Sequence, residues 1–237
     1  RVLEFDFEPE LPGWSKKLVG FDLETTGLDL STARIVTASV VEIDAAADPL
    51  FKADWLVNPG VDIPVEASAV HGVTNEIAQR DGVAPEIALA EISEFLNQHF
   101  SEGTPVVAFN APFDFTILRN ELLRHGLPPL VAKPVIDPLV MDKQFVKFRK
   151  GKRTLSILCG HYSIELLNAH ESSADALAAV RLAQHQARIF AKDMEQDPSK
   201  LHDLQIAWSR AQDEDFANFM STRNPGFQIT PGWPEKP

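Results

Sequence analysis

The stretch GFDLETTGL, residues 20–28, places two carboxylates two positions apart at the end of an apolar run. In an extended strand, side chains i and i+2 project to the same face. Asp22 and Glu24 therefore point together, while Phe21 and Leu23 face the other way. Two anions held this close repel each other unless a cation lies between them. The Thr-Thr-Gly turn that follows puts the pair at the carboxyl edge of a sheet, where open α/β sheets bind ligands. Because charged residues are mostly exposed, such a pair alone is more often a solvated strand end, and its assignment depends on further residues.

Two later segments place acidic side chains at the starts of helices. Residues 105–110 form a short apolar strand that ends at Asn110, and the helix after it carries Asp114 in its first turn. An alanine-rich helix further along is preceded by His170 and carries Asp175 near its start. Each feature alone has an ordinary explanation, because the helix dipole favours an acid in the first turn by about 0.3–1 kcal/mol. The three segments together call for one common explanation.

The four carboxylates and the histidine, in this order and at these strand and helix ends, resemble the DEDDh family of 3′→5′ exonucleases. This family includes the proofreading subunit of bacterial DNA polymerase III, ribonuclease T and oligoribonuclease. The resemblance covers about residues 17–190, in the blocks FDLETTGL, NAPFDFTIL and HESSAD, and the segment HGVT at residues 71–74 is similar to one in the family. One departure is Glu171, where many members carry Asp or Asn. The resemblance places the family's five site residues on Asp22, Glu24, Asp114, His170 and Asp175.

The resemblance implies two divalent cations, Mg²⁺ or Mn²⁺, which prefer carboxylate oxygens as ligands. It implies that Asp22 bridges both ions and that Asp114 holds one of them, directly or through water. Glu24 and Asp175 would complete the ligands of the other ion. His170 would accept the proton of the attacking water, a role that suits an imidazole with an ordinary pKa near 6.5.

The implied substrate is the 3′ end of a single strand. By resemblance, Thr25, Leu28 and Phe113 surround the terminal nucleotide, and Asn110 is a further candidate contact. Phe113 fits a core position at a helix start almost as well as it fits base stacking. DNA is the expected substrate, with RNA as the alternative, because these motifs do not decide between the two sugars. A DNA polymerase or another repair protein is a candidate partner.

Two other classes of function remain open. One is a non-catalytic nucleic-acid-binding or polymerase-binding module that has kept the fold, and the other is a metal-dependent hydrolase of a different phosphoester. The presence of all five residue types favours the exonuclease. Neither alternative predicts stepwise release of mononucleotides from a labelled strand.

Composition indicates an acidic globular protein. The 237-residue chain is 44% hydrophobic and 24% charged, with a formal net charge of −12, whereas phosphate contacts normally need Lys and Arg. Positive charge is concentrated in the run KQFVKFRKGKR, residues 143–153. This run is either a solvated connector or a track for the substrate backbone. The acidic balance favours short substrates bound by one end over wide duplex footprints.

The sequence contains no motif that indicates another class of protein. The chain has no phosphate loop, no GxGxxG after a strand, no HExxH and no GxSxG. Cys159 is the single cysteine, which excludes an intramolecular disulfide and a thiolate metal cluster. No apolar run approaches the roughly 20 residues of a membrane span, and the first residues contain no signal-peptide segment; a cytoplasmic protein without membrane contact is expected. His71, beside a glycine, is placed near the site; the other histidines are interpreted as surface or helix-end residues, including His99, His125, His161, His185 and His202.

The coarse pattern predicts an α/β protein with a ribonuclease H-like mixed five-stranded sheet flanked by helices. Strands are expected at residues 18–23, 34–43, 53–57, 106–109 and 134–136, the first three as an antiparallel meander. Helices are expected at residues 85–100, 113–125, 154–161, 172–192 and 199–220. The predicted division is an N-terminal arm at 1–16, an exonuclease domain at 17–196, and a C-terminal helix with a Pro-rich tail, 197–237, packed on that domain.

Overall fold

A mixed five-stranded sheet forms the centre of the structure, a computed structural model that describes residues 11–166 and 169–237. The strands lie in the order β3-β2-β1-β4-β5, with bounds β1 Leu18–Thr25, β2 Ile35–Ile43, β3 Pro49–Leu56, β4 Val106–Val107 and β5 Val135–Ile136. The first three strands form an antiparallel meander, and the last two run parallel to β1. β1 is therefore the central strand, and its carboxyl end lies on the same edge of the sheet as that of β4.

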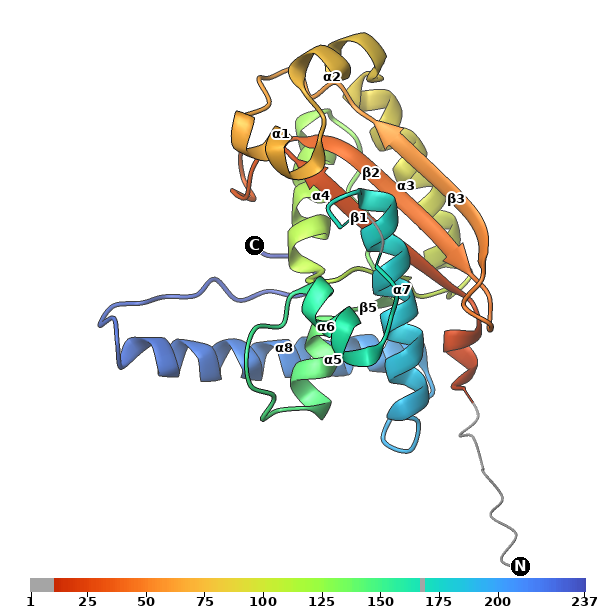
Figure 1. The fold of residues 1–237 in the computed structure, drawn as a ribbon, viewed down its shortest axis with the longest axis vertical. Helices are drawn as coiled ribbons and strands as arrows, with labels where there is room; N and C mark the ends of the chain where they lie inside the picture. Colours follow the sequence, from red (N-terminus) through yellow and green to blue (C-terminus); the bar gives the residue numbers. More distant parts are fainter. Residues whose placement is uncertain (1–10, 167–168) are drawn as a thin grey trace, which may run out of the picture.

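Helices cover both faces of the sheet. α3 (Pro85–Ser101) and α4 (Pro112–Arg124) pack on one face, and α7 (Ser172–Ile189) packs on the other (Figure 1). The remaining helical segments are η1 Gly13–Lys16, α1 Val65–His71, α2 Asn75–Asp81, α5 Pro138–Phe145, α6 Leu155–Tyr162 and α8 Pro198–Ser221. Within residues 11–166 and 169–237, no helix is both long and apolar enough to cross a membrane.

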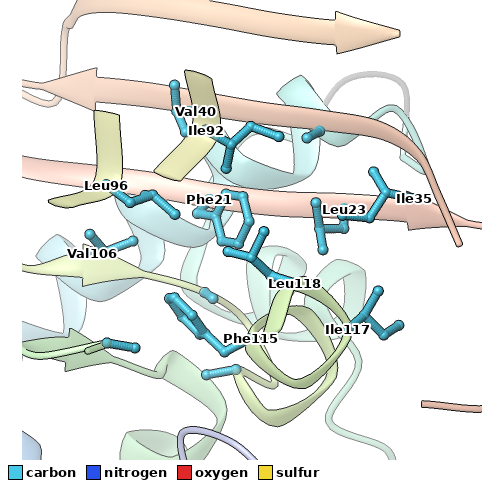
Figure 2. Close-up of a cluster of buried hydrophobic side chains, with 14 of the residues drawn as sticks. Phe21, Leu23, Ile35, Val40, Ile92, Leu96, Val106, Phe115, Ile117 and Leu118 are labelled. Atoms are coloured by element: carbon cyan, nitrogen blue, oxygen red, sulfur yellow. The ribbon is translucent and has the colours of Figure 1, made fainter. Parts of the chain in front are cut away.

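Alternate side chains of β1 face the two layers of helices. Phe21 and Leu23 are buried with residues of α3 and α4 (Figure 2). The ring of Phe21 lies 5.5 Å from that of Phe115, between ring centroids. Because neighbouring positions along a strand face opposite ways, Asp22 and Glu24 lie on the face that α7 covers. The apolar positions thus fix the strand and present both carboxylates to α7.

Gly20 allows α7 to approach β1 closely. A Cβ at this position would lie 2.3 Å from the carbonyl oxygen of Ala176 and 3.2 Å from Cβ of Val180. Since the first of these atoms belongs to helix backbone, it cannot be displaced by a simple side-chain rotation. Gly20 is two residues from Asp22, and Ala176 is next to Asp175, so this contact sets the spacing of two acidic residues of the site.

Gly20→Ala should destabilise the protein by about 1–3 kcal/mol, as overpacking in a close-packed interior generally does. Chemical denaturation measures the change. Gly160→Ala is the matched control, because a Cβ there would meet nothing within 4 Å and alanine is about 1 kcal/mol more favourable than glycine in a helix. A Gly20→Ala protein as stable as the wild type would show that α7 does not require this close approach.

The predicted architecture is confirmed, with differences at the ends of elements. The five strands and the antiparallel meander are present. The third strand begins at Pro49 rather than at residue 53, and the fourth and fifth are two residues long, because ladder pairing there is brief. The helices α1, α2 and α5 are not predicted from the sequence. α1 and α2 have seven residues each, about two turns, in which helical periodicity has little length to show; α5 has eight.

His99 and His202 are expected to be surface or helix-end residues; His99 does lie in the last turn of α3, but neither ring is at the surface. His99 and His202 are 5% and 4% exposed. Nε2 of His99 lies 2.9 Å from Oε2 of Glu42, and Nδ1 of His202 accepts the amide hydrogen of Val135 at 3.0 Å. Burial lowers the pKa of His202 to about 4. Both rings satisfy polar groups inside the fold, which their positions in the sequence do not reveal.

Segments near both ends of the chain pack on the central sheet. Trp14 of η1 is buried and donates its indole hydrogen to the carbonyl of Glu195 at 2.9 Å. Residues 1–10 of the predicted arm lie outside the described residues. α8 lies along β5: Oε1 of Gln205 accepts the amide of Asp137 at 2.8 Å, and its Nε2 donates to the carbonyl of Val135 at 3.1 Å. The C-terminal helix therefore shares hydrogen bonds with the sheet edge.

Candidate active site

The two carboxylates of β1 lie half-buried at the carboxyl end of the strand, as the motif predicts. The pKa of Asp22 is raised well above its ordinary value because burial disfavours the charged form. Repulsion from the carboxylates of Asp114, Asp175 and Glu24 adds to this rise. Burial, with the charge of Asp175, raises the pKa of Glu24 to about 7. Mutual repulsion of this kind is relieved when a cation binds between the groups.

α4 holds Asp114 against the same strand end. Pro112 occupies the first turn of the helix, where its missing N–H costs nothing. Oδ1 of Asp114 accepts the amide hydrogen of Leu23 at 3.0 Å, and this amide lies between the two carboxylates of β1. The side chain is only 2% exposed. Burial raises the pKa of Asp114, although the hydrogen bond from Leu23 opposes the rise.

The start of α7 supplies the histidine and the fourth acid. Ser172 fixes this helix end to β2, since its hydroxyl lies 3.1 Å from that of Thr37 and 2.7 Å from that of Ser39. His170 has a positive φ of 72°, and its amide donates to Oδ2 of Asp175 at 3.2 Å. Burial raises the pKa of Asp175, and the hydrogen bond from His170 opposes this rise.

The donor atoms of these elements fit a divalent cation. Glu24, His170 and Asp175 each offer a ligand atom, and the three atoms lie within 4.8 Å of one another. Oδ1 of Asp175 is buried and has no hydrogen-bond partner among residues 11–166 and 169–237. A buried carboxylate oxygen without a donor is costly, whereas a cation would satisfy it. Carboxylate oxygens with an imidazole nitrogen are ligands that divalent cations take.

Without metal, the protein should become more stable as the pH falls from about 7 to about 4.5. The pKa of Glu24 is about 7 in the folded state and 4.5 in its ordinary environment. Between these values the folded state binds more protons than the unfolded state, so stability decreases as pH rises. Melting temperatures in a chelator at several pH values test this. Glu24→Gln should flatten the dependence, and identical pH profiles for wild type and variant would contradict the assignment.

A cavity of about 530 Å³ opens beside Glu24. The predicted contacts Thr25, Leu28 and Phe113 line it, together with His71 from the HGVT segment and with His170. Leu28 is 86% exposed, so its side chain is available to a ligand. The hydroxyl of Thr25 donates to the carbonyl of Gly27 at 2.7 Å, which stabilises the turn after the strand. His71 lines the cavity, in agreement with its predicted place near the site.

Asn110 does not line this cavity. It has a positive φ of 64° at the turn between β4 and α4. It lines a different groove, beside α8. Its role as a contact of the terminal nucleotide is therefore not supported by the geometry, although the residue lies only four positions before Asp114.

Asp137 supports the site and is missed by the sequence interpretation. This side chain is 1% exposed. Its Oδ1 accepts the amides of Asn110 at 3.1 Å and Leu139 at 2.9 Å, and its Oδ2 accepts the amide of Ala111 at 3.0 Å and the indole hydrogen of Trp233 at 3.2 Å. It therefore fixes the turn that leads into α4. An acid at a strand end directly before a proline is a signal for a helix N-cap, which could have identified it.

The sequence matches a known family over most of its length. The family described as "Exonuclease" matches residues 19–183. A DNA polymerase III subunit epsilon-like protein of Rhodobacter capsulatus is 37% identical over 128 residues, which are 52% of this chain and 17% of that protein. The DNA polymerase III subunit epsilon of Rickettsia prowazekii is 28% identical over 193 residues, 78% of this chain and 81% of that protein. The chain spans a minor part of several such relatives, and 10% of a PolC-type polymerase of Lactococcus lactis.

Solved structures share the fold. Escherichia coli exonuclease I, solved in complex with a dT13 oligonucleotide, aligns with a TM-score of 0.61 and 20% identity, over 75% of this chain and 43% of that one. The nuclease domain of 3′hExo, a DEDDh family member bound to rAMP, aligns with a TM-score of 0.61 and 14% identity, over 75% of this chain and 92% of that one. These matches agree with the mixed sheet and its flanking helices.

The fold is a ribonuclease H-like mixed sheet with helices on both faces, and carboxylates cluster at the end of its central strand. The chain belongs to the exonuclease family. The resemblance to DEDDh exonucleases that the sequence motifs indicate is confirmed by the family match and by the structural neighbours.

Proposed function

We propose that this chain removes nucleotides one at a time from the 3′ end of single-stranded DNA and releases nucleoside 5′-monophosphates. One observation carries the proposal. Side chains from β1, α4 and the start of α7 converge at the carboxyl end of β1, and two of them, Glu24 and His170, line a cavity of about 530 Å³, within the roughly 300–1,000 Å³ of small-ligand sites. The converging residues are Asp22, Glu24, Asp114, His170 and Asp175.

Mg²⁺ or Mn²⁺, two ions together, are the proposed cofactors. When bound, such ions neutralise charge on phosphate oxygens and make water a better nucleophile. Asp22, whose pKa responds to three neighbouring carboxylates, is the residue best suited to contact both ions. Glu24 and Asp175 would hold one, and Asp114 would hold the other, directly or through water. The ions would also satisfy the buried Oδ1 of Asp175.

His170 is the proposed general base. Its ring is exposed, and its ring nitrogen lies within the same 4.8 Å cluster as the oxygens of Glu24 and Asp175. It would accept a proton from the water that attacks the phosphorus. As the new P–O bond forms, the bond to the 3′ oxygen breaks, and that oxygen takes a proton from solvent. The products are a nucleoside 5′-monophosphate and a strand one residue shorter with a free 3′-hydroxyl.

The cavity would hold the terminal nucleotide. Leu28, Val70 and Phe113 supply apolar surface to the base, and aromatic stacking is tolerant of base identity. No side chain that lines the cavity offers the bidentate amide or guanidinium pattern that reads base edges. Sequence preference should therefore be slight, and the terminal nucleotide should enter unpaired.

RNA is the second candidate substrate. A DEDDh neighbour was solved with rAMP, and exonuclease I was solved with a DNA oligonucleotide. We favour DNA because relatives of this chain are named as DNA polymerase III subunits or polymerases. The same names make a DNA polymerase the proposed partner. A non-catalytic module is disfavoured because all four carboxylates and the histidine are retained.

The test is degradation of 5′-labelled single-stranded DNA and RNA of equal sequence, with Mg²⁺, Mn²⁺ or a chelator. We expect a ladder of products shortened from the 3′ end, dependent on metal, and slower cleavage of a fully paired blunt duplex. Failure to release mononucleotides from either strand with both metals would exclude the proposed function. Equal rates on a blunt duplex and on a single strand would exclude entry of an unpaired end.

A further inference from the structure

A second groove, of about 700 Å³, lies between the connection after α5 and the helix α8. Figure 1 shows this connection and α8 in the lower part of the molecule, away from the strand end that carries Asp22 and Glu24. Lys147 and Phe148 from the connection, Trp208 and Phe216 from α8, and Lys236 from the tail are among its lining residues. Neither the carboxylate cluster nor the terminal-nucleotide cavity uses this surface.

The basic run in residues 143–153 divides into two parts with different roles. Arg149 and Arg153 both bond to the carboxylate of Asp142, which is 0% exposed. These two cations neutralise a buried acid and hold the connection in place. Lys147, in contrast, is exposed and lines the groove. The run is therefore part structural support and part open cationic surface.

The groove is more basic than the protein as a whole. Besides Arg153, three lysines line it, Lys143, Lys147 and Lys236, against the two acids Asp213 and Asp215. Burial raises the pKa of Asp213, and the charges of Lys143 and Lys236 oppose this rise. A surface with an excess of cations in a chain of net charge −12 is a local attraction for a polyanion.

Phe148 is the most unusual feature of the groove. It is 96% exposed, and it stands between Lys147 and the paired Arg149 in sequence. An exposed aromatic ring beside cations is the combination that single-strand binding proteins use, with stacking for bases and charge for the backbone.

The groove and the terminal-nucleotide cavity are connected by one short stretch of chain, the turn that leads into α4. Asn110 lines it, and Phe113, three residues later, lines the terminal-nucleotide cavity. Asp137 binds the amides of Asn110 and Ala111, and it also accepts the indole hydrogen of Trp233 from the tail. The walls that α8 and the tail contribute are thereby attached to the loop that positions Asp114, and the two surfaces are held in a fixed relation.

We propose that this groove binds the part of the single strand that lies 5′ to the nucleotides at the catalytic cluster. Lys147 contacts its phosphates and Phe148 stacks on one of its bases. The inference rests on the proposed function, because it takes the 3′ end to lie in the cavity beside Glu24. Its consequence is a preference for strands long enough to reach from that cavity to α8.

The test compares thymidine oligomers of 3 and 12 nucleotides. Kinetics with Mg²⁺ give KM for each length, and fluorescence anisotropy of a 5′-labelled 12-mer gives its Kd. The variants are Phe148→Ala and Lys147→Glu. Lys150→Glu is the matched control, because Lys150 is also exposed in the same run but does not line the groove.

We expect the wild type to favour the 12-mer, and Phe148→Ala to weaken 12-mer binding by about 5- to 150-fold, the factor that corresponds to loss of one stacking contact. Lys147→Glu should also weaken 12-mer binding, because it replaces a cation with an anion. The preference for the long oligomer should shrink by the same factor, and Lys150→Glu should change it less than twofold. Equal losses for both lengths, or an equal effect of Lys150→Glu, would overturn the proposal. Binding that depends on Phe148 without any hydrolysis would retain the groove and reject the nuclease function.

Discussion

Replacing Asp22 with Asn should abolish measurable hydrolysis while the protein keeps its fold. Asp22 is the residue whose pKa reflects all three neighbouring acids, and the amide removes the charge with almost no change in shape. Two ions that share one carboxylate lose a common ligand at once, so we expect residual activity below a few per cent of the wild-type rate. A folded Asp22→Asn protein with substantially more activity would reject Asp22 as the bridging ligand.

The same variant should be at least as stable as the wild type in a chelator at neutral pH. Burial and like charges make the ionised Asp22 unfavourable, and the neutral amide relieves that repulsion. Mn²⁺ should raise the melting temperature of the wild type by mass action, and should raise that of Asp22→Asn much less. Asp62→Asn, at an exposed acid outside the cluster, is the control and should respond to Mn²⁺ as the wild type does. Equal shifts in all three proteins would show that the metal binds elsewhere.

The placement of the candidate site residues was predictable from sequence where short motifs coincide with the ends of regular elements. Asp22 and Glu24 follow strand alternation, and Asp114 follows a proline that begins a helix. Such local rules fix where a side chain points. They do not fix how far apart two elements lie, and the meeting of β1 with α7 depends on the missing Cβ of Gly20, 2.3 Å from a helix carbonyl.

The sequence could not show which distant segments hold the site residues in place. Asp137 joins the turn at Asn110 to Trp233, residues separated by more than a hundred positions. Neither residue has a local pattern that marks it as a partner of the other. The two roles within the basic run are hidden for the same reason, because Asp142, which binds two of its arginines, is recognised as buried only in the folded chain.

Short strands and short helices explain the remaining differences. β4 and β5 have two residues each, since their pairing is limited by the turns that carry Asn110 and Asp137. α1 has no buried residue, so no apolar stripe marks it in the sequence. Its residues Val70 and His71 nevertheless line the cavity beside Glu24, and the proposed function thereby involves an element that hydrophobic periodicity does not detect.

Replacing His170 with Asn should lower kcat by about 10²–10⁴-fold, the usual contribution of a positioned acid–base group. Asn is the suitable substitute because His170 has a φ of 72°, and Asn tolerates this left-handed region better than other non-glycine residues. The hydrogen bond to Asp175 comes from the backbone amide, so the variant can keep it. The melting shift with Mn²⁺ and the affinity for a single strand should therefore stay close to those of the wild type.

The pH dependence separates a base from a ligand. A base must be unprotonated, so the wild-type rate with saturating metal should rise with pH as the base loses its proton. This rise of the rate with pH should be absent in His170→Asn. His161→Asn, at an exposed histidine outside the site, should keep the wild-type rate and its rise with pH. The opposite result is a His170→Asn protein that loses the rise in melting temperature with Mn²⁺ while its residual rate still rises with pH as in the wild type. That result would make His170 a metal ligand, and the proton would go to another group.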